Sequence, residues 1–200
     1  MAKVKGERNN DFCPQALYLY GTYREDGTPN FGLFCWFSYL WDQGLGAMAC
    51  IGEDKLTKDL IRRNGAFSAN LVTEDLLPLA DYYGNTPGHS KDKMKRQPAV
   101  EAGQVLSVPT IVESPVSFEL EPYQEIPLSQ GSDLFLCRIR NVMREENLTD
   151  RGEDFAARLR RAAPVVTVGE QHYCSLDGRD LGRWGGPMGR LQERKEEKPC

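Results

Sequence analysis

Two residues in the first third of the chain could bind a phosphate group. Lys55 precedes, and Thr57 lies within, the amphipathic stretch LTKDLIRRNG, which has the apolar spacing of a short helix. A helix N-terminus presents unpaired backbone N–H groups and about half a positive charge, so it stabilises anions. A lysine amine and a threonine hydroxyl beside it would add charge and hydrogen bonds. The pattern predicts a site for a phosphorylated cofactor.

A simpler interpretation of the same segment is a surface helix without a ligand. A threonine such as Thr57 is tolerated in a helix, and His89, in a polar loop, has the setting of a surface histidine. Four cations also have the spacing of a solvated helix face: Lys55, Lys58, Arg62 and Arg63.

The cysteines do not form a metal-binding pattern. The chain has six, none in a CxxC pair, and its two histidines, His89 and His172, stand at no ligand spacing from them. We therefore expect no metal site. Cys35 and Cys50 lie in apolar runs, and the start MAKVKGERNNDF has no apolar signal-peptide core. An even number of cysteines would also fit a disulfide framework, but these features favour buried free thiols that pack in the core.

Composition excludes several classes of protein. The chain has 200 residues, 40% of them hydrophobic and 27% charged, which fits one domain with a core. Its formal net charge of −4 lacks the positive excess that drives non-specific nucleic-acid binding, so we expect no nucleic-acid partner. No run approaches the ~20 apolar residues that span a bilayer. We expect no membrane segment and a cytoplasmic location.

The elements expected around Lys55 are mostly strands. Residues 15–40 hold two apolar runs joined by Asp26-Gly27, a dipeptide typical of hairpin turns. A further strand over 44–52 leads directly into the helix. We expect Asp54 to cap that helix and Gly65 to end it, with the lysine and arginines of the segment turned away from its apolar face.

The rest of the chain predicts more strands than helices. A polar loop follows over 85–104, and its length predicts function or disorder. The charged end, 190–200, has no apolar period and predicts a disordered tail with Cys200 exposed. The other expected elements are strands over 66–72, 114–126, 132–146 and 165–169, a helix from about Thr73 to Gly84, and a helix over 152–164 ended by Pro164. This order predicts a mainly β fold, a barrel.

Four groups of residues occur along the chain in a characteristic order and spacing, although no single group is specific to one family. They are Asn30 and Trp36 after the DGTP turn, Lys55 with Thr57, the crossing Ile61, Gly65, Phe67 and Asn70, and, after LADYYG, the loop residues Ser90, Lys91 and Lys93. This order resembles the flavin reductase-like proteins of the flavoredoxin type, over about Cys13 to Gly182. The resemblance implies an FMN-binding split β-barrel with a few short helices over 13–182, an N-terminal arm over 1–12 and a partly disordered tail over 183–200.

The resemblance also implies which residues contact FMN. Lys55 and Thr57 match positions that hold the phosphate. Residues near the ribityl chain and phosphate are Asn70, Ser90, Lys91 and Lys93, and Asn30 belongs to the same site. The segment that passes the flavin ring is Leu33, Phe34, Cys35, Trp36, Phe37 and Ser38. Relatives often carry a Thr/Ser-rich run where this chain has Gly32 to Cys35, so the ring edge here would rely on backbone N–H groups or on Cys35. From the residues alone, Trp36, Phe37 and Tyr39 are aromatic side chains that could form an apolar slot for a flat ring. The simpler interpretation of Trp36 and Phe37 is that they are core aromatics, and one of them could be both core and ring wall.

Two functions follow from this resemblance. One is an enzyme that takes hydride from NADH or NADPH onto FMN and passes electrons to free flavin or another acceptor. The other is a flavoredoxin-like carrier that holds FMN and is reduced by a redox partner protein. Besides these two functions, a further interpretation is a split-barrel protein that has lost its flavin. No catalytic side chain is expected, because the hydride chemistry belongs to the cofactor. The resemblance further implies a homodimer with FMN near the interface, to which Gly84–Gln104 and 175–186 would contribute.

Overall fold

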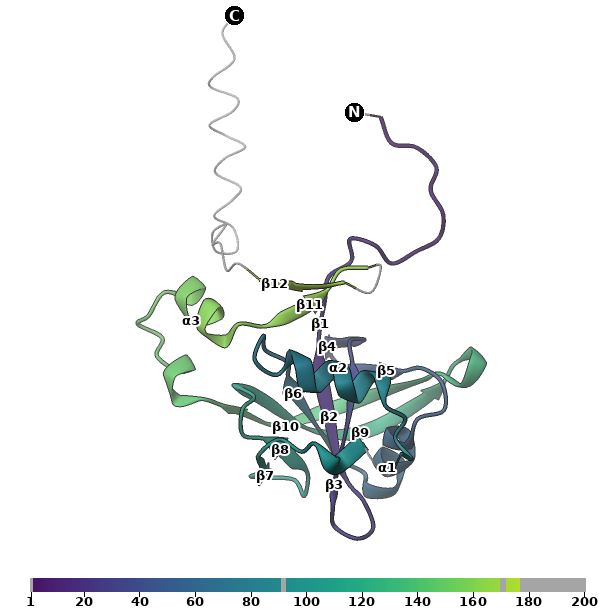
Figure 1. Ribbon diagram of the computed structural model, residues 1–200, viewed down its shortest axis with the longest axis vertical. Coiled ribbons are helices and arrows are strands. Elements are labelled where there is room, and N and C mark those ends of the chain that lie inside the picture. Colours follow the sequence, from purple (N-terminus) through teal and green to yellow (C-terminus); the bar gives the residue numbers. More distant parts are fainter. Residues whose placement is uncertain (1, 91–92, 170–171, 177–200) are drawn as a thin grey trace, which may run out of the picture.

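The centre of the molecule is a seven-stranded sheet in the order β3-β2-β6-β9-β10-β5-β4 (Figure 1). The computed structural model describes residues 2–90, 93–169 and 172–176. Each pair of neighbouring strands is antiparallel. The strands are β2 (Tyr18–Tyr23), β3 (Pro29–Phe34), β4 (Phe37–Trp41), β5 (Leu45–Ile51), β6 (Phe67–Leu71), β9 (Val116–Pro127) and β10 (Asp133–Arg144). The mainly β expectation is confirmed.

The curled sheet has an apolar cluster on each face because side chains alternate along its strands. On β2, Tyr18 and Tyr20 point into the barrel with Phe67 and Phe118. The alternate residue Leu19 belongs to a second cluster, which lies under the helix α2 (Leu77–Asn85). The two edge strands, β3 and β4, are consecutive in sequence and are joined only by Cys35 and Trp36. The barrel is therefore open at this point.

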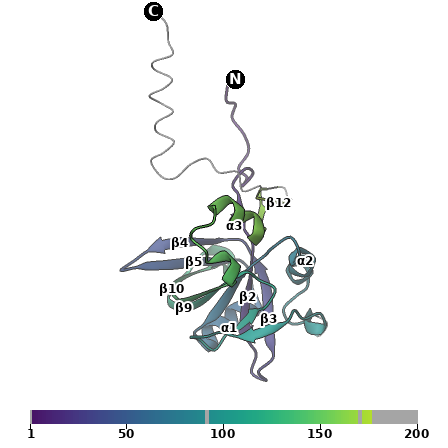
Figure 2. The same ribbon diagram turned by 90° about the vertical axis from the view of Figure 1, so that its left-hand side faces the viewer.

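The predicted hairpin at Asp26-Gly27 is confirmed, with Tyr20 opposite Gly32 in the register of β2 and β3. The second apolar run is not one strand, however. At Trp36 the chain makes a tight turn in which Phe37 N–H donates to the Cys35 carbonyl at 2.9 Å. Beyond it, β4 pairs with β5 instead of with β2. Figure 2 shows β4 and β5 reaching away from the barrel as a two-stranded ribbon.

The helix α1 (Leu56–Asn64) ends as predicted. Gly65 adopts φ 64° and donates its N–H to the Ile61 carbonyl. Its start differs from the prediction, because the cap residue is Lys55 and no side chain caps the first turn. The expectation that Asp54 caps the helix was wrong. The placement of Lys58 on the solvated face was also wrong, since it is buried.

The helix α2 begins four residues later than predicted, because Thr73 forms an isolated β-bridge with Pro164 and its hydroxyl accepts from Leu76 N–H. Gly84 lies within this helix and does not end it. The following polar loop contains a 3₁₀ turn over Lys93–Lys95 and the strand β7 (Val100–Ala102), which pairs with β8 (Pro109–Ile111).

The remaining elements form a layer at one end of the barrel, near the N-terminal arm (Figure 1). The helix of this layer, α3 (Phe155–Ala162), ends before Pro164 as predicted, and its C-cap residue Ala163 adopts φ 43°. The elements are α3 (Phe155–Ala162) and a three-stranded sheet of β1 (Gln15–Ala16), β11 (Val165–Thr167) and β12 (Tyr173–Ser175). The predicted tail over 183–200 and Cys200 lie outside the described residues.

Within the described ranges, no helix is long and apolar enough to cross a membrane. Five described cysteines are free thiols, but only Cys137 is buried; Cys13 and Cys174 are exposed and Cys35 and Cys50 are half-buried. The expectation of buried thiols therefore holds for one of them. The described part of the chain contains no cluster of three potential metal ligands.

Candidate cofactor site

Two adjacent cavities lie where β3 meets the start of α1. One, the polar cavity, has a volume of about 420 Å³ and is lined by Gly32, Leu33, Phe34, Asp54, Lys55, Leu56, Thr57, Tyr83, Gly84, Asn85, Thr86, Pro87, Gly88, His89 and Lys93. The other, the slot, has a volume of about 350 Å³ and is lined by Leu33, Phe34, Cys35, Trp36, Cys50, Gly52, Glu53, Lys55, Gln130 and Ser132. Three residues, Leu33, Phe34 and Lys55, line both cavities.

The start of α1 forms one wall of the polar cavity. The Thr57 side chain is buried there, and its Oγ1 accepts from Asn30 Nδ2 at 3.3 Å, which leaves its O–H free to donate toward a ligand. A Cβ at Gly32 would lie only 3.0 Å from Thr57 Oγ1, so glycine is what lets β3 approach the helix start. Asn30 does not line the cavity, and it supports Thr57 from behind.

Lys93, from the 3₁₀ turn after α2, also lines the polar cavity. Its side chain is 4% exposed, and its amine lies 5.8 Å from the centre of the Tyr83 ring. Burial, together with the nearby cations Lys55 and Arg24, lowers the pKa of Lys93 to about 8. No carboxylate of a described residue lies within 4.0 Å of this amine. A buried cation without an anion is unfavourable on its own, so the cavity is suited to an anionic ligand.

Two further cations, Arg24 and Lys55, lie near enough to Lys93 to affect its pKa. Arg24 donates through Nη2 to Asn30 Oδ1 at 3.3 Å and to the Gly88 carbonyl at 3.0 Å, which holds the loop after α2 near the helix start. Lys55 is half exposed and pairs with Glu53 at 2.8 Å, and that bond lowers the pKa of Glu53. Lys55 lines both cavities.

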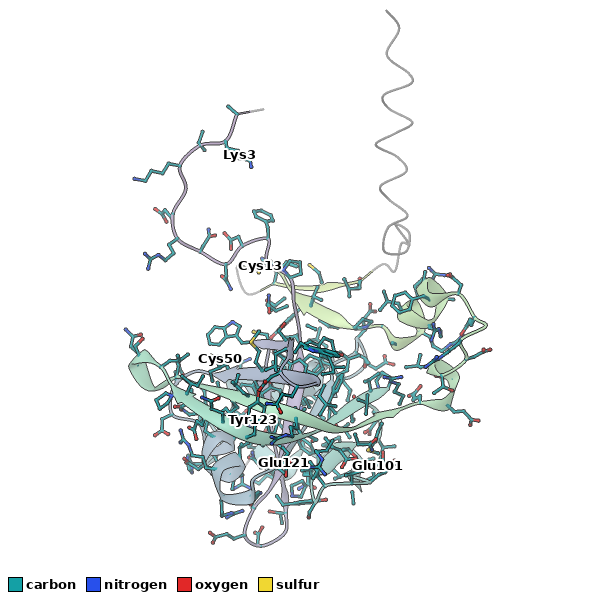
Figure 3. The ribbon with its side chains drawn as sticks, turned by 180° about the vertical axis from the view of Figure 1, so that it is seen from behind. Lys3, Cys13, Cys50, Glu101, Glu121 and Tyr123 are labelled. Atoms are coloured by element: carbon teal, nitrogen blue, oxygen red, sulfur yellow. The ribbon has the colours of Figure 1, made fainter. Side chains whose placement is uncertain are left out.

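The slot is less polar and more open than the polar cavity. Trp36 is 52% exposed, so its interpretation as a core aromatic was wrong, and it forms a wall of the slot instead. Phe34 forms another wall and stacks on Tyr20 with ring centres 4.6 Å apart. Cys35 and Cys50 also line the slot. Cys50, labelled in Figure 3, lies near the C-terminal end of β5. Burial raises the pKa of both thiols, so neither has the lowered pKa of a reactive cysteine.

Several predicted residues are not brought to either cavity. Phe37 packs inside the barrel against Tyr18, with ring centres 4.6 Å apart. Ser38 and Tyr39 are exposed on β4 and line neither cavity. Ser90 lines neither, and its carbonyl accepts from Lys93 N–H at the start of the 3₁₀ turn. Lys91 lies outside the described residues.

Asn70 is also separated from the cavities, because every polar group of its side chain is used inside the fold. Its Nδ2 donates to the Leu19 carbonyl and to Ser68 Oγ, both at 2.9 Å. Its Oδ1 accepts from Ile111 N–H at 3.0 Å and from Ser117 Oγ at 2.7 Å. The geometry gives Asn70 a structural role between strands.

Sequence reasoning missed Arg24, Gln130 and Ser132. Arg24 follows the end of β2. Gln130 and Ser132 lie in the turn between β9 and β10, which is about 75 residues beyond the start of α1 in the sequence. No local pattern marks them. Tyr83, in contrast, lies in the LADYYG motif that the sequence had already singled out.

Comparison with known proteins identifies a family model and similar folds. The family model for the flavin reductase like domain matches residues 10–175. A search among curated proteins finds no match. Among solved structures, a flavoredoxin from Methanosarcina acetivorans is 21% identical and has a TM-score of 0.82, covering 95% of this chain and 100% of that one.

Two further solved structures share the fold. An FMN-binding protein from Thermus thermophilus, solved with bound p-hydroxybenzaldehyde, is 20% identical with a TM-score of 0.73, and the match covers 92% of this chain and 99% of that one. A putative flavin reductase with a split barrel domain from Shewanella frigidimarina is 17% identical with a TM-score of 0.75, covering 88% and 87%. The predicted split-barrel fold is confirmed.

Proposed function

This chain belongs to the flavin reductase like domain family, and we propose that it binds FMN and acts as an NAD(P)H-dependent flavin reductase. In this proposal the phosphate of FMN lies in the polar cavity and its ring lies in the slot. Each cavity has a volume within the ~300–1,000 Å³ typical of small-molecule sites.

The observation that carries the proposal is that the buried Lys93 lines the same cavity as the start of α1, which no side chain caps. Lys93 supplies a positive charge that is not paired with the carboxylate of any described residue. The start of α1 supplies backbone N–H groups at Leu56 and Thr57. Charge-assisted hydrogen bonds of this kind contribute about 1.5–3 kcal/mol each. The donor set therefore fits a phosphate better than it fits a neutral group or a metal ion.

The other residues of the two cavities orient the cofactor and exclude water from around it. Thr57 Oγ1, held by Asn30, donates to the phosphate, and Lys55 spans the two cavities. Leu33, Phe34 and Trp36 give the ring apolar walls. When bound, FMN supplies the capacity to accept hydride and to release electrons one or two at a time.

The open side of the slot supports a reductase over a carrier. The exposed Trp36 stands at a cavity that opens to solvent, where a nicotinamide could approach the ring. The flavoredoxin-like carrier remains the second function, and the two are separated by the experiment below. A cytoplasmic location stays a prediction.

We also propose that the protein is a homodimer. Its β4–β5 ribbon exposes large apolar side chains, with Tyr39 at 55%, Leu45 at 57% and Trp41 at 80% exposure. Exposed apolar groups gathered on an edge strand fit burial against a second copy. Sedimentation of the purified protein measures this directly, and a monomer at micromolar concentration would contradict it.

The reductase proposal is tested by anaerobic absorbance spectra. The protein is mixed with FMN, then with NADH and, in a separate sample, with NADPH. Rapid bleaching of bound flavin by either nucleotide is expected. Bound flavin that stays oxidised would identify the carrier, and the absence of bound flavin would overturn the cofactor assignment.

The phosphate site is tested by the double variant Lys55→Ala with Thr57→Ala. We expect its FMN Kd to rise about tenfold or more, because a charge and a hydroxyl donor are lost. Its far-UV circular dichroism is expected to match the parent protein. An unchanged Kd would reject this assignment.

A further inference from the structure

Besides the charged pair Lys55 and Glu53, the slot has polar side chains from the turn between β9 and β10. Gln130 and Ser132 of this turn line the slot. A Cβ at Gly52 would lie 3.3 Å from Trp36 Cζ3 and 3.7 Å from Ser132 Oγ, so the indole and the hydroxyl flank the same glycine. The opposite wall, from Leu33 to Cys35, carries no hydroxyl or amide side chain.

The backbone of this turn is unusual at Gln130, which adopts φ 58° and ψ 37°. Left-handed conformations cost a non-glycine residue about 1–2 kcal/mol. Gly131 follows with φ 72°, and Leu128 N–H donates to the Ser132 carbonyl at 2.8 Å to close the turn. A turn of this shape needs no glutamine for its own stability, since glycine or asparagine would fit it better.

A buried charge network holds the turn in place. The Lys58 amine, with its side chain 4% exposed, donates to the Gly131 carbonyl and to Asp133 Oδ2, the latter at 2.7 Å. Arg62 donates to the same Asp133 oxygen at 2.9 Å and also contacts Glu125. The hydrogen bond from Lys58 lowers the pKa of Asp133. A buried ion pair adds little net stability, and its best-supported use is to fix one geometry.

Lys58 also connects the turn to the start of α1, which forms one wall of the polar cavity. It follows Thr57 in the first turn of α1, so the residue beside the polar cavity and the residue that holds the turn are consecutive. The two ends of a bound cofactor would therefore be positioned by one short rigid segment.

We propose that Gln130 is a ring-binding residue of the slot, whose side-chain amide hydrogen-bonds the polar edge of the flavin ring, and that Lys58 is the residue that positions it. The proposal rests on the proposed function, and it assigns the polar contacts that the segment from Gly32 to Cys35 does not provide.

The test compares Gln130→Ala with Ser129→Ala, a matched change in the same turn at a residue that does not line the slot. We expect Gln130→Ala to shift the absorption bands of bound FMN, to make its midpoint potential more negative and to raise the Kd for FMN and for riboflavin by the same several-fold factor. The potential falls because an amide donor no longer stabilises the electron-rich reduced ring. Ser129→Ala is expected to change none of these.

Lys58→Met provides the second measurement. We expect it to reproduce the shift of Gln130→Ala, and the double variant to show no shift beyond that of Gln130→Ala alone. Bound FMN with an unchanged spectrum, potential and Kd in Gln130→Ala would overturn the inference while leaving the proposed function intact. Failure of the parent protein to bind FMN would overturn both, and the titration of the parent distinguishes the two results.

Discussion

The polar cavity and the slot are neighbours, but they are built differently. The polar cavity is preformed around buried groups, with Thr57 4% and Lys93 4% exposed. The slot is bounded by the 52% exposed Trp36 and by a turn from a distant part of the chain. The buried donors of the polar cavity favour a charged group. The open apolar wall of the slot accepts a flat ring and discriminates less between ligands. We therefore expect affinity to reside mainly in the polar cavity and the chemistry to occur in the slot.

The largest effect is expected from removal of the buried amine. Lys93→Met should raise the FMN Kd about 10- to 150-fold, which corresponds to one charge-assisted bond of ~1.5–3 kcal/mol. Fluorescence titration measures it. Lys95→Met, in the same 3₁₀ turn but outside both cavities, is the matched control. Equal affinities in the two variants would show that Lys93 does not bind the ligand.

The same amine predicts a pH dependence that the slot should not share. The pKa of Lys93 is lowered from 10.5 to about 8, so the free protein loses this cation as the pH rises through about 8. FMN affinity should therefore fall by up to about tenfold per pH unit between pH 8 and 9.5. Titrations from pH 7 upward measure it, and a parent protein with no such slope would contradict the assignment.

Stability should change in the opposite direction over this range. Between about 8 and 10.5 the unfolded chain holds the Lys93 proton and the folded chain does not, so folding without ligand becomes more favourable as the pH rises. Denaturant unfolding of the parent and of Lys93→Met isolates this contribution, which only the parent should show.

A smaller effect is expected from the wall of the slot. Trp36→Leu should raise the Kd for FMN and for riboflavin by the same factor, about 3- to 10-fold, because an aromatic contact contributes ~0.5–1.5 kcal/mol. The free energy of unfolding should hardly change, since the side chain is half exposed. A loss of stability without a change in Kd would return Trp36 to the core.

The smallest effect on binding is expected at Asn70. Asn70→Ala should leave the FMN Kd unchanged while lowering the free energy of unfolding by about 1–3 kcal/mol, because Ile111 N–H and Ser117 lose their buried acceptor. Binding and denaturant unfolding of the same variant measure both. A clear rise in Kd with unchanged stability would restore Asn70 to the cofactor site.

The sequence predicted the parts of this site that depend on local patterns. The hairpin turn, the helix of Lys55 and its end at Gly65 follow from short-range rules. The burial of Lys58 could not be predicted in this way, because its partners Gly131 and Asp133 are more than 70 residues away. Its charge favoured a solvated position until that network was visible.

The same limit explains why the surroundings of Trp36 and Asn70 could not be predicted. An aromatic residue in an apolar run favours a core position, yet the tight turn at Trp36 directs the chain out of the barrel. Asn70 was assigned by its place in a motif, and its four side-chain bonds became apparent only from strand packing. Gln130 carried no signal because nothing local distinguishes a ligand-binding turn from an ordinary one.

The division between the two cavities is tested most directly by the affinities of FMN and riboflavin for the parent protein at pH 7. The two ligands share the ring and differ in the phosphate. We predict that FMN binds at least about 100-fold more tightly, the effect of two or more charge-assisted contacts. Equal affinities would contradict the account, because the polar cavity would then not hold the phosphate.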